Sequence, residues 1–264
     1  MASITDCIVE GLKYPFNDIK KLLGFGVLCA LMSALSTFIG IKSNNSISQI
    51  PFTQLPAGDI YLVAGLAILS FIVTLFIWGY QYDIIKFSID NKSDLPGFSD
   101  ILGMFIKGIK YFIVTLAYII IPIIVFIVGT VLAGNSTAAA AVTLILVVLL
   151  VIAYFFLIMA LINMIAHDDI RKAFDFSQIT DNISNLGWGK YVGIILFTLI
   201  VMMIISVAVS FILSFITVLF AAIINNQAFV ISIVIAIIEG LFIDSYMGLF
   251  FNRVCGSIYR ESIK

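Results

Sequence analysis

Long apolar runs alternate with short polar segments along this chain. An α-helix rises about 1.5 Å per residue, so roughly 20 apolar residues cross the hydrocarbon core of a bilayer. Runs of at least that length cover residues 22–41, 60–82, 111–133, 138–166, 191–224 and 228–251. The pattern therefore predicts an all-α integral membrane protein, with residues 1–264 forming one domain of six transmembrane helices.

Three of the polar segments carry an apolar periodicity of their own. The clearest stripe follows the i, i+3, i+4, i+7 spacing of one helical face and comprises Phe98, Ile101, Leu102, Phe105, Ile106 and Ile109. Ser99 suits the N-cap of this helix and Asp100 its first turn. With looser stripes elsewhere, we expect amphipathic helices over about 4–13, 99–109 and 169–184. They either lie in the membrane interface or pack beneath the transmembrane bundle.

A related tetrapeptide precedes three of the spans. The chain reads GLKY at 11–14, GIKY at 108–111 and GKY at 189–191. Three repeated units of a surface helix and a membrane hairpin would explain this recurrence. The general preference of Lys and Tyr for membrane interfaces explains it equally.

Composition supports the membrane class. Hydrophobic residues make up 62% of the chain and charged residues 11%, and the mean hydropathy is +1.19. Soluble domains average about 45–50% apolar and about 25% charged residues. Too few charges remain to cover a water-facing surface, and a net charge of −1 gives no case for nucleic acid. We expect membrane lipids as partners, with other membrane proteins or a second copy of the chain as further candidates.

The cations predict the orientation. With six spans, every Lys and Arg except Lys42 falls on the side that carries both termini. Because Lys and Arg are enriched in cytoplasmic loops, both termini are expected in the cytoplasm of a multi-pass cell-membrane protein. The fifth run is long for one upright crossing, so it tilts, begins in the interface or contains a re-entrant turn. Two crossings in this run would move Arg253 and Arg260 outside, so we reject that division.

The chain lacks the usual signatures of catalysis. It has one histidine, and the adjacent residues His167, Asp168 and Asp169 point about 100° apart if helical, so they do not converge on an ion. No nucleophile elbow, zinc-protease motif or phosphate loop occurs. We therefore expect no catalytic residue, no cofactor site and no metal site, and a protein that is not an enzyme.

Two acids inside the sixth span are the candidate polar site. Glu239 lies about 16 Å into this span at helical rise, and Asp244 follows it. Acids at that depth are costly and are functional candidates by default. In a structural role, a protonated Glu239 would donate to the Tyr118 carbonyl that Pro122 leaves without its helical partner. The alternative is a proton- or cation-handling role.

Small residues recur at every fourth position in the last two runs. They are Ser206, Ser210 and Ser214 in the fifth, and Ser232, Ala236, Gly240, Asp244, Gly248 and Asn252 in the sixth. Such spacing lets helices approach closely. It predicts either tight packing or a polar path for a solute between these spans.

The middle of the chain resembles an uncharacterised membrane family, domain of unknown function 4013. The matching features are Gly79-Tyr80 at a span end, Leu95-Pro96-x-Phe98, the acid-led helix at Asp100, Gly108-x-Lys110, and Tyr118-x-x-x-Pro122. The segments at 12–26 and 258–262 also look like the start and end of that family. The resemblance implies a source among methanogenic archaea or some bacteria, and it implies architecture without an established activity.

Two function hypotheses follow. The first is a non-enzymatic envelope or membrane-organising protein that acts through partners or lipids. The second is a transporter or channel subunit that uses a polar path between the last two spans, with Glu239 and Asp244 as its acids.

Overall fold

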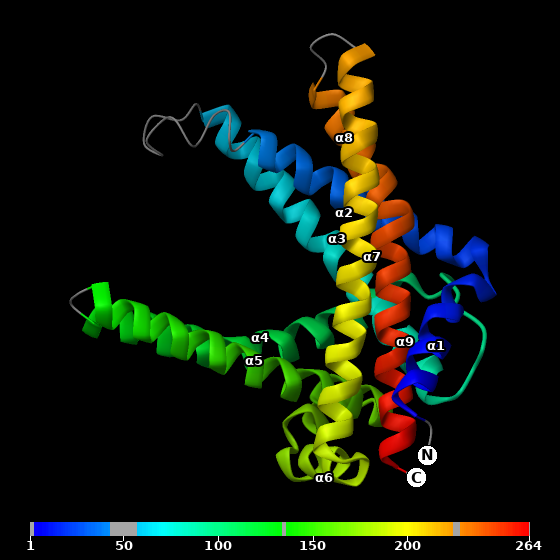
Figure 1. Cartoon of the computed structure of the whole chain (residues 1–264), viewed down its shortest axis with the longest axis vertical. Helices are drawn as coiled ribbons and strands as arrows, with labels where there is room; N and C mark the ends of the chain where they lie inside the picture. Colours follow the sequence, from blue (N-terminus) through cyan, green and yellow to red (C-terminus); the bar gives the residue numbers. More distant parts are fainter. Residues whose placement is uncertain (1–2, 43–56, 134–135, 224–227, 264) are drawn as a thin grey trace.

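The computed structural model describes residues 3–42, 57–133, 136–223 and 228–263, and over these ranges it is helical (Figure 1). The elements are α1 Ile4–Lys13, η1 Tyr14–Asn17, α2 Ile19–Lys42, α3 Ala57–Ile89, α4 Ile101–Ala133, α5 Ser136–His167, η4 Ile170–Phe174, α6 Phe176–Leu186, α7 Trp188–Ile223, α8 Ala228–Ile238, η5 Glu239–Asp244 and α9 Ser245–Ser262. Among the described residues, six helices are long and apolar enough to cross a membrane, which confirms the predicted fold class of a six-span, all-α membrane protein.

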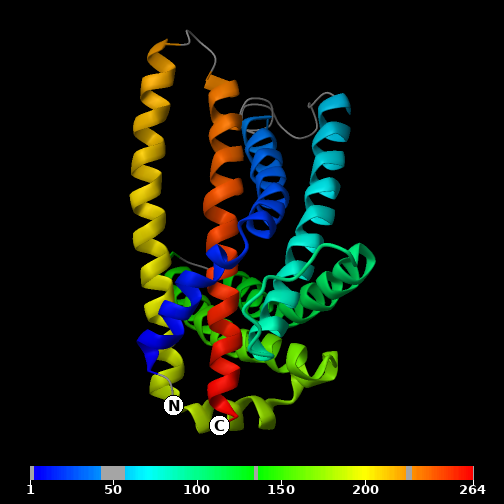
Figure 2. The same cartoon turned by 90° about the vertical axis from the view of Figure 1, so that its right-hand side faces the viewer.

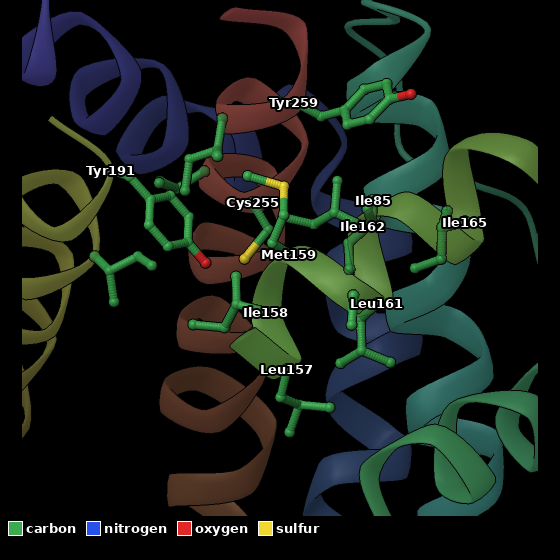
Figure 3. Close-up of a cluster of buried hydrophobic side chains, with 14 of the residues drawn as sticks. Ile85, Leu157, Ile158, Met159, Leu161, Ile162, Ile165, Tyr191, Cys255 and Tyr259 are labelled. Atoms are coloured by element: carbon green, nitrogen blue, oxygen red, sulfur yellow. The ribbon is translucent and has the colours of Figure 1, made fainter. Parts of the chain in front are cut away.

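The elements that carry both ends of the described chain meet in one packed region. We call it the hub and define it as residues 4–17, 80–118, 155–195 and 246–262. Figures 1 and 2 show α1, α6 and the end of α9 together there. Its core brings together Met159, Ile162 and Ile165 of α5 with Tyr191 of α7 and Ile85 of α3 (Figure 3). The Tyr191 hydroxyl donates to the Phe155 carbonyl at 2.6 Å, so a buried polar group is satisfied.

Beyond the hub the helices separate. The α4–α5 hairpin leaves in a different direction from α7 and the helix formed by α8, η5 and α9 (Figure 1). Helix α2 joins these last elements instead: Gly26 lies against Leu241, and Gly240 lies against Ala30. Among the side chains described between residues 123 and 156, none is buried. We call the outer part of the α4–α5 hairpin, residues 119–156, the arm.

Helix α1 coincides with the surface helix predicted over 4–13. Ser3 and Asp6 form its capping box, each side chain bonding to the other's backbone N–H. The buried residues Cys7, Ile8 and Gly11 face protein, with Gly11 against Phe250 and Val254 of α9. The stripe of α1 therefore packs on the hub.

The segment predicted as a helix over 99–109 is helical from Ile101 and continues directly into the third span. Helix α4 runs without a break from Ile101 to Ala133. Between Ile101 and the predicted start of the third span no proline interrupts the backbone, so the surface segment and the span form one helix. Its N-cap is Asp100, whose carboxylate accepts the Gly103 N–H at 2.9 Å, one residue after the expected Ser99.

The segment predicted over 169–184 is two elements. The short 3₁₀ helix η4 ends at Phe174, and the next residue, Asp175, caps α6 by accepting the Gln178 N–H. Ile179 and Ile183 of this segment are buried in the hub, whereas Phe174 is exposed. The fifth run is a single helix, α7, without a re-entrant turn.

Candidate functional site

The residues singled out by the family resemblance lie where α3 and α4 cross. Gly79 of α3 faces the Met104 carbonyl and Gly108 of α4 faces the Leu75 carbonyl, so each glycine lets the other helix's backbone approach. A side chain at either position would overlap that carbonyl. The two glycines thus fix the crossing from both sides.

Tyr80 holds the segment that links these helices. Its ring stacks on Phe98 at 4.6 Å between centroids and its hydroxyl donates to the Pro96 carbonyl at 3.0 Å. Leu95 is buried beside it, and Phe25 of α2 stacks on the opposite side of Tyr80 at 4.8 Å. Through Tyr80, the motif therefore packs the polar linker between α3 and α4 against α2, the first span.

The N-terminal segment fastens the same linker from outside. The Tyr14 hydroxyl donates to the Asp94 carbonyl at 3.0 Å, Asn17 donates to the Ser93 carbonyl at 2.9 Å, and Lys21 donates to the Leu95 carbonyl at 2.6 Å. These bonds give the backbone carbonyls of the linker their partners.

Lys110, the last residue of the family-like motif, belongs to a second polar group. Its ammonium lies 3.0 Å from the carboxylate of Asp168, which also accepts the Tyr82 hydroxyl at 2.6 Å. The Tyr82 hydrogen bond and then the Lys110 partner lower the pKa of Asp168 below its ordinary value. This group ties the end of α5 to both α3 and α4.

The three residues at 167–169 have different partners and do not converge on a common site in the structure. His167 closes α5 and bonds through Nδ1 to the Asn163 carbonyl, while Asp168 adopts the left-handed φ of 51° that ends the helix. Asp169 then caps η4 by accepting the Arg171 N–H at 3.0 Å. They act as the end of one helix and the start of the next.

A charged cluster that sequence analysis missed lies between α1 and α9. Arg253 is 5% exposed, donates to Glu10 at 2.8 Å and to the Lys92 carbonyl at 2.6 Å, and covers the Tyr14 ring at 4.5 Å. Arg260 meets the same Glu10 carboxylate at 2.6 Å. Burial raises the pKa of Glu10, but the Arg260 hydrogen bond and both guanidinium charges outweigh it and leave that pKa lowered.

The sequence held a signal for this cluster. Arg253, Ser257 and Arg260 stand at i, i+4 and i+7, which is one helical face. Ser257 bonds to Glu10 at 3.3 Å from within that face. The acid is far away in sequence, however, so spacing alone does not identify the partner.

The two predicted intramembrane acids stand at the two ends of η5, a π-helical segment inside the sixth span. Such segments occur often at functional sites. Asp244 accepts the Ser33 hydroxyl of α2 at 2.8 Å. Glu239 faces the other way, into a pocket of about 170 Å³ that it shares with Ser210, Ser214 and Thr217 of α7. The two acids therefore have different neighbours.

Glu239 does not meet the partner predicted for it. Tyr118 and Pro122 line a different pocket, between α4 and α5, and the Tyr118 hydroxyl donates to the Ala173 carbonyl at 2.7 Å. The mismatch follows from the direction of the α4–α5 hairpin, which points away from the sixth span (Figure 1).

The small residues of the sixth run were expected to pack against the fifth span, but Gly240 and Gly248 pack against α2. Gly240 lies against Ala30, and Gly248 lies against Phe25, both on α2. The spacing correctly predicted close packing, but with the first span and not the fifth. The fifth-span serines Ser210 and Ser214 face Glu239 and are otherwise exposed.

No group of three or more metal-ligating side chains occurs within the part of the chain that the structure describes.

Comparison with known proteins agrees with the motif at the α3–α4 crossing. The profile of a family described as a protein of unknown function (DUF4013) matches residues 62–214. This range contains the motif from Gly79 to Pro122, but neither the 12–26 nor the 258–262 segment. No curated protein and no solved structure matches the chain. With more than half of its length matched, the chain belongs to the DUF4013 family of membrane proteins of unknown function.

Proposed function

We propose that this protein is a non-enzymatic membrane organiser, which uses the arm to hold lipids or the spans of partner membrane proteins. The supporting observation is the unburied arm: helices that are apolar all round require lipid or another protein as surroundings. Val131 and Leu132 near its tip are each 78% exposed. In the hub, by contrast, ion pairs join the elements to one another.

The distribution of charge supports an orientation for this organiser. The Lys and Arg side chains of the ion pairs all lie in or beside the hub, as with Lys107 paired to Asp83 at 2.7 Å. We place the hub on the cytoplasmic side of the cell membrane, with both termini there. The arm then enters the bilayer from that side.

Photo-crosslinking in native membranes tests the proposal. A benzophenone amino acid is placed at Leu144, which is 67% exposed on the arm, and, as a matched control, at Phe211, which is 77% exposed on α7. We expect discrete protein or lipid adducts from Leu144 that Phe211 does not give. The same bulk-lipid pattern from both positions would contradict the proposal.

A second candidate, a transporter or channel subunit, is favoured by the Glu239 pocket. Its carboxylate has no hydrogen-bond partner among the described residues, and hydroxyl groups of α7 line the same space. An oxygen-lined pocket with one acid suits a proton or a small cation. Asp244 does not extend this pocket into a path, because it faces Ser33.

Substitution separates the two candidates. Glu239→Gln keeps the shape and removes the titrating charge. An organiser retains its Leu144 adducts in this variant, whereas a transporter loses proton or cation flux in vesicles. Measurable flux that Glu239→Gln abolishes would make transport the better account.

A further inference from the structure

The base of the arm contains a groove that the proposed function leaves unassigned. It lies between α4 and α5 and is closed toward the hub by η4 and the first turn of α6. Its volume is about 380 Å³, within the range of about 300–1,000 Å³ that small-molecule sites occupy. The residues that matter for its shape are Tyr118, Pro122, Ala153, Phe156, Phe174 and Phe176.

The groove runs from a hydrocarbon-like wall to an aromatic rim. Deeper on the arm, Ile121, Leu149 and Ile152 supply aliphatic side chains from the spans. At the hub end Phe174 and Phe176 come from outside the spans and are 42% and 56% exposed. Aromatic side chains gather where the bilayer meets water, so the groove crosses from acyl-chain depth to headgroup depth.

Fixed contacts keep the groove open. The Tyr118 hydroxyl is held by the Ala173 carbonyl, and its ring lies 6.2 Å from Phe174 and 6.1 Å from Phe176. Ala153 presents only a methyl group to the space. The wall is therefore preformed, and an occupant need not order it.

A cation lies at the hub end of the groove, in the same short helix as Phe174. Arg171 precedes Phe174 by three residues in η4, and residues three apart eclipse each other in a 3₁₀ helix, so both lie on one side of it. Arg171 is exposed, and its guanidinium has no partner among the described residues. Its neighbour Lys172 is instead engaged by Asp175 at 3.0 Å and Gln178 at 2.9 Å.

A free guanidinium beside an acyl-sized groove is complementary to an anionic lipid, because guanidinium binds phosphate through paired hydrogen bonds. We propose that the groove holds an acyl chain of an anionic glycerophospholipid and that Arg171 binds its phosphate. This assignment rests on the proposed lipid-organising function and names the lipid class for it. A free phosphate ion would leave the apolar wall uncovered.

The two tryptophans of the chain give a direct readout. Trp188 packs on Phe156 of the groove wall, 6.2 Å between rings, whereas Trp78 lies beside Tyr111 and Phe112. Trp78→Phe leaves Trp188 as the only reporter, and Trp188→Phe leaves Trp78 as the control. The protein is placed in phosphatidylcholine nanodiscs that contain equal amounts of chain-brominated phosphatidylglycerol or chain-brominated phosphatidylcholine.

Brominated phosphatidylglycerol should quench Trp188 with about a fivefold preference over brominated phosphatidylcholine, which corresponds to about 1 kcal/mol for one cation at the membrane surface. Trp78 should show no preference. Arg171→Gln should abolish the preference, and the matched change Lys20→Gln, at an exposed cation of α2, should retain it. Ala153→Phe should reduce quenching of Trp188 by both lipids, whereas Ala34→Phe, in the groove lined by α2, α3 and α8, should not.

Equal quenching of Trp188 by both lipids, or a preference that survives Arg171→Gln, would overturn the assignment of the phosphate to Arg171. Quenching that Ala153→Phe leaves unchanged would overturn the groove as the lipid site. Either result leaves the arm's adducts at Leu144 as a separate test of the organiser itself.

Discussion

Arg253 joins three chain segments from a position that is 5% exposed. It bonds to Glu10 of α1 and to the Lys92 carbonyl after α3, and it covers the Tyr14 ring. A buried guanidinium is tolerated only when its charge and its donors are matched. This matching explains how α9 continues past the apolar run to Ser262 while carrying charged residues.

Arg253→Ala should therefore be strongly destabilising. Breaking one partner of a buried ion pair typically costs about 3–5 kcal/mol, because the other charge is left unpaired. Since Glu10 retains Arg260, we expect the lower end of that range. Thermal unfolding in detergent measures it, with Lys20→Ala as the exposed control. A variant that melts with the parent would show that the cluster does not hold the hub.

Glu10 should give the protein an acid-dependent stability. Its folded pKa lies below the ordinary value of 4.5, so its contribution is complete above pH 4.5 and is lost as the pH falls through the folded pKa. Glu10→Gln should be less stable than the parent at neutral pH, and the gap should narrow below pH 4.5. Melting curves across this range provide the measurement. The pKa values of Asp168 and Asp175 are also lowered, but these residues are present in both the parent and Glu10→Gln, so their effects cancel in the comparison. A stability difference between the two proteins that does not depend on pH would therefore exclude the Glu10 mechanism.

Among the helices, the α3–α4 crossing depends on two glycines that face each other's backbone. Gly79 and Gly108 leave no room for a methyl group, while Gly65, on the outer half of α3, has no neighbouring atom within 4 Å of the place where a methyl group would stand. Close backbone contact of this kind gives membrane helices much of their association energy.

Gly79→Ala and Gly108→Ala should each lower stability by about 1–3 kcal/mol, the usual cost of overpacking. Gly65→Ala in the same helix α3 should be neutral or slightly stabilising, because alanine is the better helix former. Chemical unfolding of the three variants side by side makes the comparison. Equal effects at positions 65 and 79 would mean that the crossing is not tightly packed.

Apolar run length was enough to predict all six spans, because each span buries its backbone polarity within itself. It could not predict that α4 starts at Ile101, since run length marks the apolar part of a helix and not the polar turns that continue it outside the membrane. Nor could it predict η5, because a π-helical turn depends on how α2 packs against Gly240. The Glu10 partnership with Arg253 joins residues 243 positions apart, and only the fold reveals it.

At the scale of the whole molecule, the arm is an unburied hairpin: none of its described side chains beyond Pro122 is buried up to residue 156. The arm and α7 leave the hub in different directions in Figure 1, and membrane helices are tilted by up to about 40° from the bilayer normal. Because none of its described side chains from 123 to 156 is buried, we predict that the direction of the arm varies about its base. Pro122 stands at that base and removes one helical hydrogen bond there.

The proposed orientation can be tested by labelling. Cys7 and Cys255 are 1% and 4% exposed, so they should not react from either side. A cysteine at Gly97, which is exposed with open space around it, should react with an impermeant maleimide only after the cells are permeabilised. A cysteine at Ser46, outside the described residues, should react in intact cells. Labelling of Gly97→Cys in intact cells would reverse the orientation.

The central claim is that the arm leaves the hub separately from the other spans, and the distance between hairpin tips tests it most directly. Spin labels at Leu132 of the arm and Phe220 of α7, both exposed, are measured in nanodiscs by pulsed dipolar spectroscopy. A pair at Val131 and Leu144, within the arm, is the control. We predict a broad distribution at longer distances for the first pair and a narrow, short one for the control. A narrow, short distance for Leu132 and Phe220, as expected for helices packed with axes about 8–10 Å apart, would contradict the account.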